Sequence, residues 1–577
     1  MRLKISASKN AKSLYVIRST YINGKHSSKV VEKLGTYDEL KKTHNDPIAW
    51  AKEYIKQLTE QEKEQKREVV VHFKQSKHLP KDKQQCFFGG YLFLQSLYNQ
   101  LGLSAICQAI SSRHKFTYDL DNILSYLLYT RILFPSSKKS SYGFARRFIE
   151  PPTFEPHQMY RALEFLAAED DYIQAQLYAN TQKLSKRNDR ILYYDCTNFF
   201  FEIEQEDNFR KYGASKEHRP NPIVEMGLLM DGDGIPLAYC LHSGNTNEQI
   251  TLQPLEKKIL KDFTLSKFIL CTDGGLSSLS NRKYNTRGER AFITTQSLKK
   301  LKAHLKDWAL DPTGWKIPNS HKEYDLTQIN SLTPESPAYT TVYNQTFYKD
   351  RWINENGFEQ HLIVTYSLKY KDYQKRIREQ QVQRAAKAID ANGTPLKKYN
   401  SNDYKRLVKK TQVTKDGEIA EKELYELNEE RITQEAQYDG FYAVCTSLTD
   451  SPVEIIRINQ RRWEIEESFR IMKTEFRTRP IYLSREQRIR AHFLTCFLSL
   501  ILYRYLEKKT DNKFTPRELI YTLRDMNFLQ IPTGDYVPTY TRTDITDVLH
   551  EVFGFRTDYE ILSEKQMKKI LKTTRKA

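Results

Sequence analysis

The segment Asn459-Gln-Arg-Arg-Trp-Glu-Ile-Glu-Glu-Ser-Phe-Arg-Ile-Met-Lys473 decides how the rest of this chain is interpreted. It contains no Gly or Pro, and most of its residues favour a helix. At about 100° per residue, one narrow stripe of that helix carries an acid between two cations: Arg462, Glu466, Phe469 and Lys473. Ile465 and Met472 lie beside the stripe, on the flank that faces a core. Such a stripe indicates a carboxylate aimed at a ligand. The alternative is a solvated face held by weak pairs four residues apart.

Length and charge narrow the class of protein. A chain of 577 residues predicts three or four structural units. Its net charge of +19 indicates a polyanionic partner, most plausibly nucleic acid. A membrane is the competing partner, but no run of about 18 apolar residues exists. The most apolar stretch, 493–502, is interrupted by Thr495, Cys496 and Ser499, and therefore predicts a buried helix.

The seven cysteines exclude two common kinds of site. Their number is odd and no CxxC pair is present, so neither a disulfide framework nor a zinc site is indicated. The N-terminus lacks the apolar region of a signal peptide. A reducing cytoplasm fits both observations.

Two upstream aspartates stand in or beside apolar strands. Asp195 lies within the strand-like run 191–201, and Asp273 ends the run 268–273 and is followed by Gly274. An acid in a buried strand destabilises the fold by several kcal/mol unless it is paired or coordinates a cation. The structural alternatives are a turn capped by Asp195 with Thr197, and an ordinary strand-end turn at Asp273. Because Asp195 and Asp273 occur together with Glu466 in a basic protein, a role shared by the three acids is favoured.

The order of strands and helices around these acids predicts a mixed α/β fold. Strands at 223–230 and 235–242 are joined by a turn, a helix at about 250–261 follows, and 440–446 returns as a strand. The chain divides into a small β unit with an Asn23-Gly24 turn (1–45), a charged helix or linker (46–85), a helical DNA-binding domain (86–188), the first part of the α/β core (189–299), an insertion (300–438), the second part of the core (439–510) and a helical C-terminal region (511–577).

Two of these segments carry further expectations. Within the insertion we expect strands at 339–352 and 361–370, a charged helix at about 371–390 and a turn at Asn392-Gly393. Within the helical domain, the basic loop 136–141 either grips phosphates or is merely solvated.

Three carboxylates without His or Cys form a hard-oxygen donor set, which suits Mg²⁺ or Mn²⁺ rather than zinc. Two such ions about 3.5–4 Å apart activate a water or a 3′-hydroxyl and stabilise the leaving oxygen of a phosphodiester. Because carboxylates repel DNA, this chemistry also needs the surrounding Lys and Arg side chains.

The ordered set Asp195, Asp273 and Glu466, with the last acid inside Arg462-x3-Glu466-x6-Lys473, resembles the DDE transposases of bacterial insertion sequences that carry the Tyr-Arg-Glu-Lys signature. The turn at 213–220 and the stretch 233–246 also resemble that group. The similarity covers most of 1–510. One position departs from the pattern, because Asn459 stands where the signature has Tyr.

The resemblance implies an RNase H-like core with a β-rich insertion between the second Asp and the Glu. It implies metal-dependent cleavage at the terminal inverted repeats of an element, followed by attack of the freed 3′-hydroxyl on target DNA. Double-stranded DNA is the implied partner, bound by a homodimer in the synaptic complex. The implied metal ligands for two Mg²⁺ or Mn²⁺ ions are Asp195, Asp273 and Glu466; the implied phosphate contacts are Arg462 and Lys473, with Lys216, His218 and Arg219 as secondary ones.

Several alternatives stay open at this point. The turn with Lys216, His218 and Arg219 can be a plain surface turn. Related enzymes often form a hairpin intermediate and flip a base against an aromatic from the insertion. The candidates there are Trp308, Trp315 and Trp352, although a core position suits each of them better. Rival functions are a metal-dependent nuclease of the same fold without strand transfer, and a non-catalytic DNA-binding regulator derived from a transposase.

Overall fold

A computed structural model of the full chain describes residues 1–8, 11–22, 25–65, 68–72, 74–390, 403–413 and 419–576. The chain forms two compact units. The first comprises Met1–Lys83 with Ile531–Thr533, and the second comprises Gln84–Gln530 with Gly534–Ala577. Asp195, Asp273 and Glu466 all belong to the second unit.

The first unit is a small sheet with two helices. Its strands, in the antiparallel order β1-β2-β3, are β1 (Arg2–Ala7), β2 (Lys12–Ile22) and β3 (Lys25–Thr36). Helices α1 (Tyr37–Lys41) and α2 (Pro47–Gln65) follow. Leu14, Leu40 and Ala51 form its buried core. The predicted Asn23-Gly24 turn lies outside the described residues.

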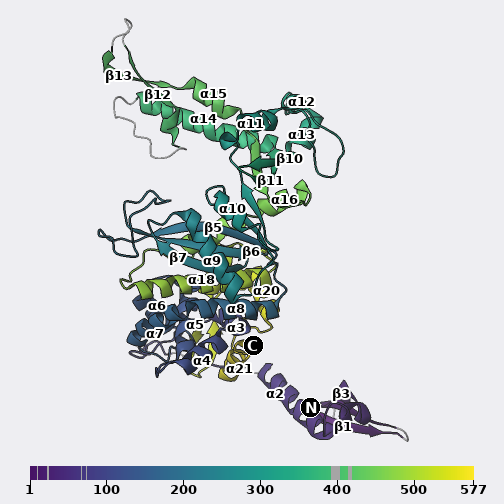
Figure 1. Cartoon of the computed structure of the whole chain (residues 1–577). Coiled ribbons are helices and arrows are strands. Elements are labelled where there is room, and N and C mark those ends of the chain that lie inside the picture. Colours follow the sequence, from purple (N-terminus) through teal and green to yellow (C-terminus); the bar gives the residue numbers. More distant parts are fainter. Residues whose placement is uncertain are drawn as a thin grey trace. The chain divides into compact units, whose positions relative to one another are not determined.

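The second unit is built around an eight-stranded mixed sheet with the order β10-β11-β14-β9-β8-β5-β6-β7 (Figure 1). Its strands are β5 (Ile191–Phe200), β6 (Ile223–Asp231), β7 (Pro236–Ser243), β8 (Ile269–Thr272), β9 (Ala291–Thr295), β10 (Phe347–Glu355), β11 (Phe358–Tyr366) and β14 (Phe441–Thr446). The pairs β5–β8 and β8–β9 are parallel, and the other neighbours are antiparallel. This sheet with its flanking helices confirms the predicted mixed α/β class.

The span 300–438 differs from the expected β-rich insertion. Its strands β10 and β11 extend the central sheet, because β11 pairs with β14 over 361–366. Residues 339–343, expected at the start of a strand, belong to helix α13 instead. The remaining elements are mostly helical: α11 (Ala303–Leu310), α12 (Leu326–Asn330), α13 (Pro337–Tyr343), α14 (Leu368–Asp390), η2 (Tyr404–Leu407), β12 (Val408–Val413), β13 (Ile419–Leu427) and α15 (Glu429–Ala436). The predicted charged helix is therefore confirmed as α14, while the Asn392-Gly393 turn lies outside the described residues.

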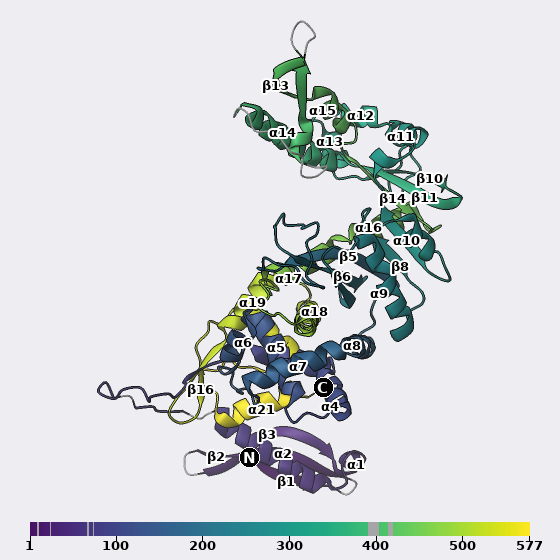
Figure 2. The same cartoon turned by 60° about the vertical axis from the view of Figure 1, so that its left-hand side comes forward.

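Helices cover the two faces of the sheet. On one face lie α8 (Asp170–Leu184) and α9 (Glu248–Asp262), which share a buried cluster with β5 and β8. On the other lie α16 (Pro452–Gln460), α17 (Trp463–Thr474) and α18 (Glu486–Lys509). Figure 2 shows α17 and α18 on the side of β5 and β6 away from α9. A strand that is covered on both faces has a nearly continuous run of apolar residues in its sequence. This is why the sequence of β5 predicts a buried strand.

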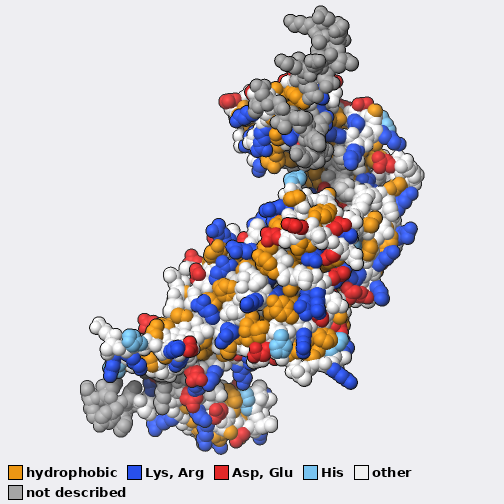
Figure 3. All heavy atoms as spheres, turned by 90° about the vertical axis from the view of Figure 1, so that its left-hand side faces the viewer, with side chains coloured by type: hydrophobic (Ala, Val, Ile, Leu, Met, Phe, Trp, Pro, Cys, Tyr) orange, Lys and Arg blue, Asp and Glu red, His pale blue; other side chains and the backbone are white. Residues whose placement is uncertain are grey.

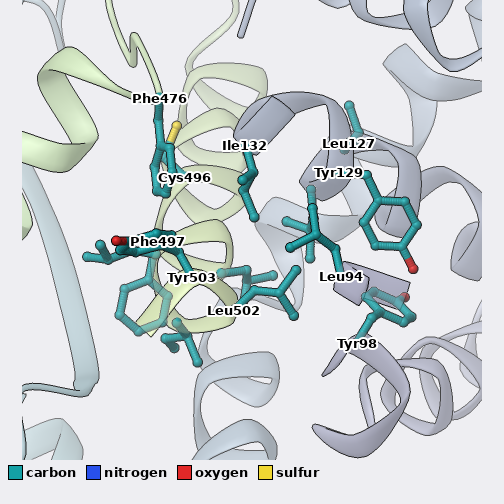
Figure 4. Packing of buried hydrophobic residues seen from close by; sticks show 14 of the residues in the cluster. Leu94, Tyr98, Leu127, Tyr129, Ile132, Phe476, Cys496, Phe497, Leu502 and Tyr503 are labelled. Carbon is teal, nitrogen blue, oxygen red and sulfur yellow. The ribbon is translucent and has the colours of Figure 1, made fainter. Parts of the chain in front are cut away.

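The predicted N-terminal helical region is confirmed. It comprises α3 (Tyr91–Gln100), α4 (Leu103–Arg113), α5 (Leu120–Leu133), α6 (Lys138–Ala145), α7 (Pro156–Ala168) and α8. Helix α18 packs against α3, α5 and α7 and against β7, so it joins this region to the sheet. Figure 4 shows the shared core, in which Cys496, Phe497 and Leu502 of α18 meet Leu94 and Ile132.

Helix α18 is, within the part of the chain that the structure describes, the one helix long and apolar enough by composition to cross a membrane. Its most apolar window is 94 % buried inside the protein. The predicted buried helix is thus confirmed.

The C-terminal region is not purely helical as expected. Besides α19 (Pro516–Asp525), α20 (Asp544–Phe553) and α21 (Glu564–Thr574), it contains β15 (Asn527–Gln530) and β16 (Tyr536–Pro538). Strand β15 forms because it pairs with β4 (Cys86–Phe88), more than four hundred residues away in the chain. Pairing over that separation leaves no local signal in the sequence.

Candidate active site

Strand β5 places Asp195 on the face of the sheet that α16 and α17 cover. Side chains of a strand alternate between its two faces. The Tyr193 hydroxyl donates to the Ile458 carbonyl at 2.8 Å, and the Thr197 hydroxyl accepts from Lys473 Nζ at 2.8 Å. Asp195 lies between these two residues and so shares their face.

The parallel pairing of β5 with β8 brings Asp273 beside Asp195. Tyr194 lies opposite Thr272 in the register, so an aspartate follows each of them: Asp195 within β5 and Asp273 directly after β8. Neighbouring strands are about 4.8 Å apart. The two aspartates, expected from two separate apolar runs, therefore follow paired positions on neighbouring strands.

The third acid reaches the site from a helix that begins later than predicted. The segment 459–473 is not one helix, because α16 ends at Gln460 and α17 begins at Trp463. The break has a cause outside the segment: the Tyr193 hydroxyl and the backbone N–H of Arg461 both bond the Ile458 carbonyl, which closes α16. Arg462 consequently stands at the N-cap of α17, with Glu466 one turn further along.

Arg462 links two of the acids directly. Its Nη2 lies 3.1 Å from Glu466 Oε1 and 4.0 Å from Asp273 Oδ1, so these two oxygens are at most about 7.1 Å apart. Burial lowers the pKa of Arg462, but Asp273, then Glu466 and more weakly Asp195, raise it above its ordinary value. The guanidinium thus pairs with Glu466 and Asp273 and lies within electrostatic range of Asp195.

The acids differ in their exposure to solvent. The Asp273 and Glu466 side chains are 49 % and 56 % exposed, so a ligand can reach them. Asp195 is partly buried, and burial raises its pKa to about 6, although Lys216 and Arg462 counteract this effect. Its Oδ1 also accepts from the Cys196 backbone N–H at 2.8 Å. These partners favour the ionised carboxylate, which is the form that binds a cation.

Lys473 stands in the last turn of α17, whereas Arg462 is the N-cap of the same helix. Its Nζ donates to Thr197 and lies 3.3 Å from Glu217 Oε1. Burial, and after it Lys216, lowers the pKa of Lys473 to about 8. Lys473 shares its one acidic partner, Glu217, with Arg479, and Lys216 lies near it as well. The amine can therefore still bind an anionic ligand.

The cationic turn at 215–219 divides into two kinds of residue. Lys216 is bonded to the protein although its side chain is 39 % exposed: Nζ lies 2.8 Å from Glu248 Oε1 and donates to the Cys196 carbonyl. Burial lowers its pKa, but Glu248 and Asp195 raise it above the ordinary value. His218 and Arg219 are exposed, and the Arg219 guanidinium packs over the Phe200 ring at 4.8 Å. Lys216 therefore supports β5 beside Asp195, while the other two face solvent.

Sequence reasoning missed Glu217 and Arg479. Glu217 pairs with both Lys473 and Arg479, and Arg479 also packs over Phe200 at 4.9 Å. Glu217 therefore connects the turn after β5 to the segment after α17. The one available signal was an acid inside an otherwise basic turn, which does not identify its distant partners.

Asn459, at the position where the resemblance led us to expect Tyr, points into the protein. It is 7 % exposed, and its Nδ2 donates to the Tyr442 hydroxyl at 3.1 Å. The Tyr442 hydroxyl also bonds Thr295 Oγ1 at 2.7 Å. Asn459 thus connects α16 to β14 and β9.

The three carboxylates form a donor set that suits divalent cations. All donors are oxygen, as Mg²⁺ and Mn²⁺ prefer. Two ions about 3.5–4 Å apart, each about 2 Å from its ligands, reach carboxylates roughly 8 Å apart, and the Asp273–Glu466 separation falls within that span.

A tighter acidic group exists elsewhere. Of the residues described, one set of three His, Cys, Asp or Glu side chains has all its ligand atoms within 4.8 Å of one another: Asp547, His550 and Asp558. Arg556 pairs with both of these aspartates. That set is therefore an ion-pair cluster with its own cations.

The tryptophans of the insertion have different surroundings. Trp315 is fully buried, and Trp308 is partly buried against the same cluster. Trp352 is 44 % exposed and stacks on His361 at 5.1 Å. The core position is thus confirmed for Trp315.

Comparison with known families matches residues 189–502 to the family described as the transposase DDE domain. The matched span covers more than half of the chain and includes all three acids. The chain belongs to the transposase DDE domain family. It is therefore a DDE transposase by class, an enzyme of DNA cleavage and strand transfer.

Two further comparisons add little to this assignment. No curated protein matches the chain. A solved structure described as the cryo-EM structure of a piggyBac transposase synaptic complex with hairpin DNA is 9 % identical, covers 85 % of this chain and 88 % of that chain, and has a TM-score of 0.36. A similarity at that score carries no argument about this DDE transposase, so the family assignment rests on residues 189–502.

Proposed function

We propose that this DDE transposase mobilises a bacterial insertion sequence of the Tyr-Arg-Glu-Lys type. It cleaves double-stranded DNA at the terminal inverted repeats of the element and joins the freed 3′-hydroxyl ends to target DNA. Its central sheet is the RNase H-like core of that group. The observation that carries the proposal is Arg462, which reaches Asp273 and Glu466 from a third element and lies within electrostatic range of Asp195.

Asp195, Asp273 and Glu466 would hold two Mg²⁺ or Mn²⁺ ions. When bound, such ions supply Lewis acidity and charge neutralisation at a phosphodiester. The chain's own cations then perform the positioning. Arg462 and Lys473 lie at the two ends of α17 and both act electrostatically on Asp195, so a scissile phosphate held between them would be presented to the acids.

The remaining cations act further from the reacting atoms. Lys216 keeps β5 in place through the Cys196 carbonyl and so acts as a positioning residue. His218 and Arg219, which face solvent, contact phosphates beyond the cleaved one. Lys and Arg side chains are also spread over the face that Figure 3 shows, in line with a net charge of +19 and a long DNA partner. A homodimer, acting on DNA in the bacterial cytoplasm, brings two ends together.

The test incubates the full chain with end-sequence DNA, a target plasmid and Mg²⁺. Wild type is compared with Asp195→Ala, Asp273→Ala and Glu466→Ala, and both nicked products and labelled ends inserted into the plasmid are counted. We expect wild type to yield both products and each variant to yield neither. Cleavage without insertion would identify a nuclease instead. Variants that cut as well as the parent would remove these acids from the mechanism.

A further inference from the structure

A cavity of about 660 Å³ lies beside the start of α6 and is lined by cationic side chains. Its walls come from the end of α5, the loop and first turn of α6, and the segment between α17 and α18. We call it the Lys138 pocket. Its charged lining residues are Arg131, Lys138, Lys139, Arg477 and Arg479, and none of the described residues that line it is acidic.

Lys138 is the unusual member of this set. Its residue surface is only 5 % exposed, and its Nζ has neither an acidic partner nor a hydrogen bond to any described residue. Burial, and after it Arg131, lowers its pKa to about 7. A buried amine without a partner is costly. Such a residue is typical of a site completed by an anionic ligand.

Arg131 contributes a second uncompensated charge. It is 3 % exposed and donates only to backbone carbonyls, those of Ser136, Phe476 and Arg477. Its Nε is buried without a partner. These bonds connect the segment at 476–477 and the loop at Ser136, which both line the pocket. No carboxylate of the described residues pairs with the positive charge of Arg131.

The start of α6 adds backbone donors to the same space. Ser137 caps the helix, its hydroxyl accepting from the Ser140 N–H at 3.2 Å, and Lys138 is the first helical residue. The first N–H groups of a helix and its positive end favour an anion. Together with two buried cations, they form a site for a phosphate group.

The pocket is connected to the acidic site through three charged side chains. Arg479 lines the pocket and pairs with Glu217, and Glu217 pairs with Lys473. Lys473 in turn donates to Thr197, two residues from Asp195. A chain of ion pairs therefore joins the pocket to the strand that carries Asp195.

We propose that the Lys138 pocket binds one backbone phosphate of the DNA on which the acidic site acts. The inference rests on the proposed function for the identity of that DNA, while the phosphate chemistry comes from the pocket itself. Its contact is separate from those of Arg462 and Lys473, because Lys138 belongs to another element and lies beyond Glu217 and Arg479.

The test measures DNA binding without metal, so that cleavage plays no part. A short fluorescent duplex is titrated with the full chain in EDTA over a range of KCl concentrations, for wild type, Lys138→Met and Lys138→Arg. The exposed Lys183 of α8 gives a matched control, Lys183→Met, with the same loss of charge. We expect Lys138→Met to reduce the slope of log K against log salt by about 0.9 and the affinity about three- to tenfold. Lys138→Arg should restore most of both.

A second measurement separates a DNA phosphate from a free one. Inorganic phosphate should compete with the duplex for wild type and raise its Tm, and should affect Lys138→Met less in both respects. Phosphate protection with an unchanged duplex slope would assign the pocket to free phosphate and overturn the proposal. An unchanged slope with no phosphate effect would overturn it as well. A chain that shows the slope change but never cuts DNA would refute the proposed function alone.

Discussion

The acidic site and the Lys138 pocket hold unbalanced charge of opposite sign in opposite settings. Asp273 and Glu466 are about half exposed and share one arginine, whereas Lys138 and Arg131 are almost fully buried and have no carboxylate. Water screens charges in the first setting, and a low dielectric strengthens their interactions in the second. The same kind of imbalance therefore has different consequences.

At the exposed acids, removing a charge changes little in the folded protein and mainly affects what the site does with its ligand. At the buried cations, the unpaired charge destabilises the fold before any ligand arrives. Variants of the acids should thus alter rates, and variants of the pocket should alter stability as well as binding.

Asp273→Asn should lower the cleavage rate by on the order of a thousandfold. The substitution removes a charged oxygen ligand while the side chain keeps its shape. DNA binding in EDTA should not weaken, since one repulsive charge is lost. Gel separation of cleaved duplex and anisotropy measure the two effects. The control is Glu467→Gln, next to Glu466 but paired with Arg470 at 2.8 Å. Equal cleavage by Asp273→Asn and wild type would exclude Asp273 from the site.

Lys138→Met should stabilise the protein by on the order of 5 kcal/mol at pH 7 and below, because the folded-state pKa of about 7 lies well under the ordinary 10.5. Between about pH 7 and 10.5 the unfolded chain binds a proton that the folded chain does not. Wild-type stability should therefore rise with pH over that window, and the advantage of Lys138→Met should shrink.

Urea unfolding at several pH values measures this difference, with Lys183→Met as the control. Arg131, Arg479 and His492 also face the pocket and are common to both proteins. Their titration therefore cancels when the two are compared. A variant less stable than wild type, or an advantage independent of pH, would show that Lys138 has a partner in solution.

Some of the site was accessible from the sequence because its signals are local. An apolar run interrupted by one Asp identified Asp195 and Asp273, and the parallel register of β5 and β8 then makes them neighbours. Helical spacing placed Glu466 one turn from Arg462. In each case the nearby residues carry the information, through apolar runs and periodicity.

The errors arose where a distant partner decides the local structure. Nothing within 459–473 indicates the break at Arg461, because the Tyr193 hydroxyl causes it from β5. Strands β10 and β11 join the central sheet through β14, and alternation of apolar residues does not specify a partner strand. The Lys138 pocket shows the same limit. Its loop looks polar, and Lys138 is buried only because segments far along the chain close over it.

Arg462→Met should lower the cleavage rate by roughly ten- to a hundredfold, which is less than the loss of an acid. The arginine orients two carboxylates and a phosphate but does not bind the cations. Arg462→Lys should recover only part of the rate, since a single ammonium cannot replace the planar fork between Asp273 and Glu466. Arg461→Met is the control, because Arg461 pairs with Glu464 instead. If Arg462→Lys recovered the full cleavage rate, Arg462 would act only through its positive charge and not through its planar shape.

Lys473→Met should have the smallest effect on binding, an affinity loss of a few-fold and a salt slope lower by about 0.9, measured with the same duplex in EDTA. Arg470→Met, on the same helix but paired with Glu467, should leave the slope nearly unchanged. The informative variant combines Lys473→Met with Lys138→Met. Distant sites with separate ligands are additive, so a double loss of about 1.8 in slope means two phosphates held at two places. A double variant no different from either single one would mean that both amines hold the same phosphate, and the acidic site and the pocket would then be parts of a single binding site.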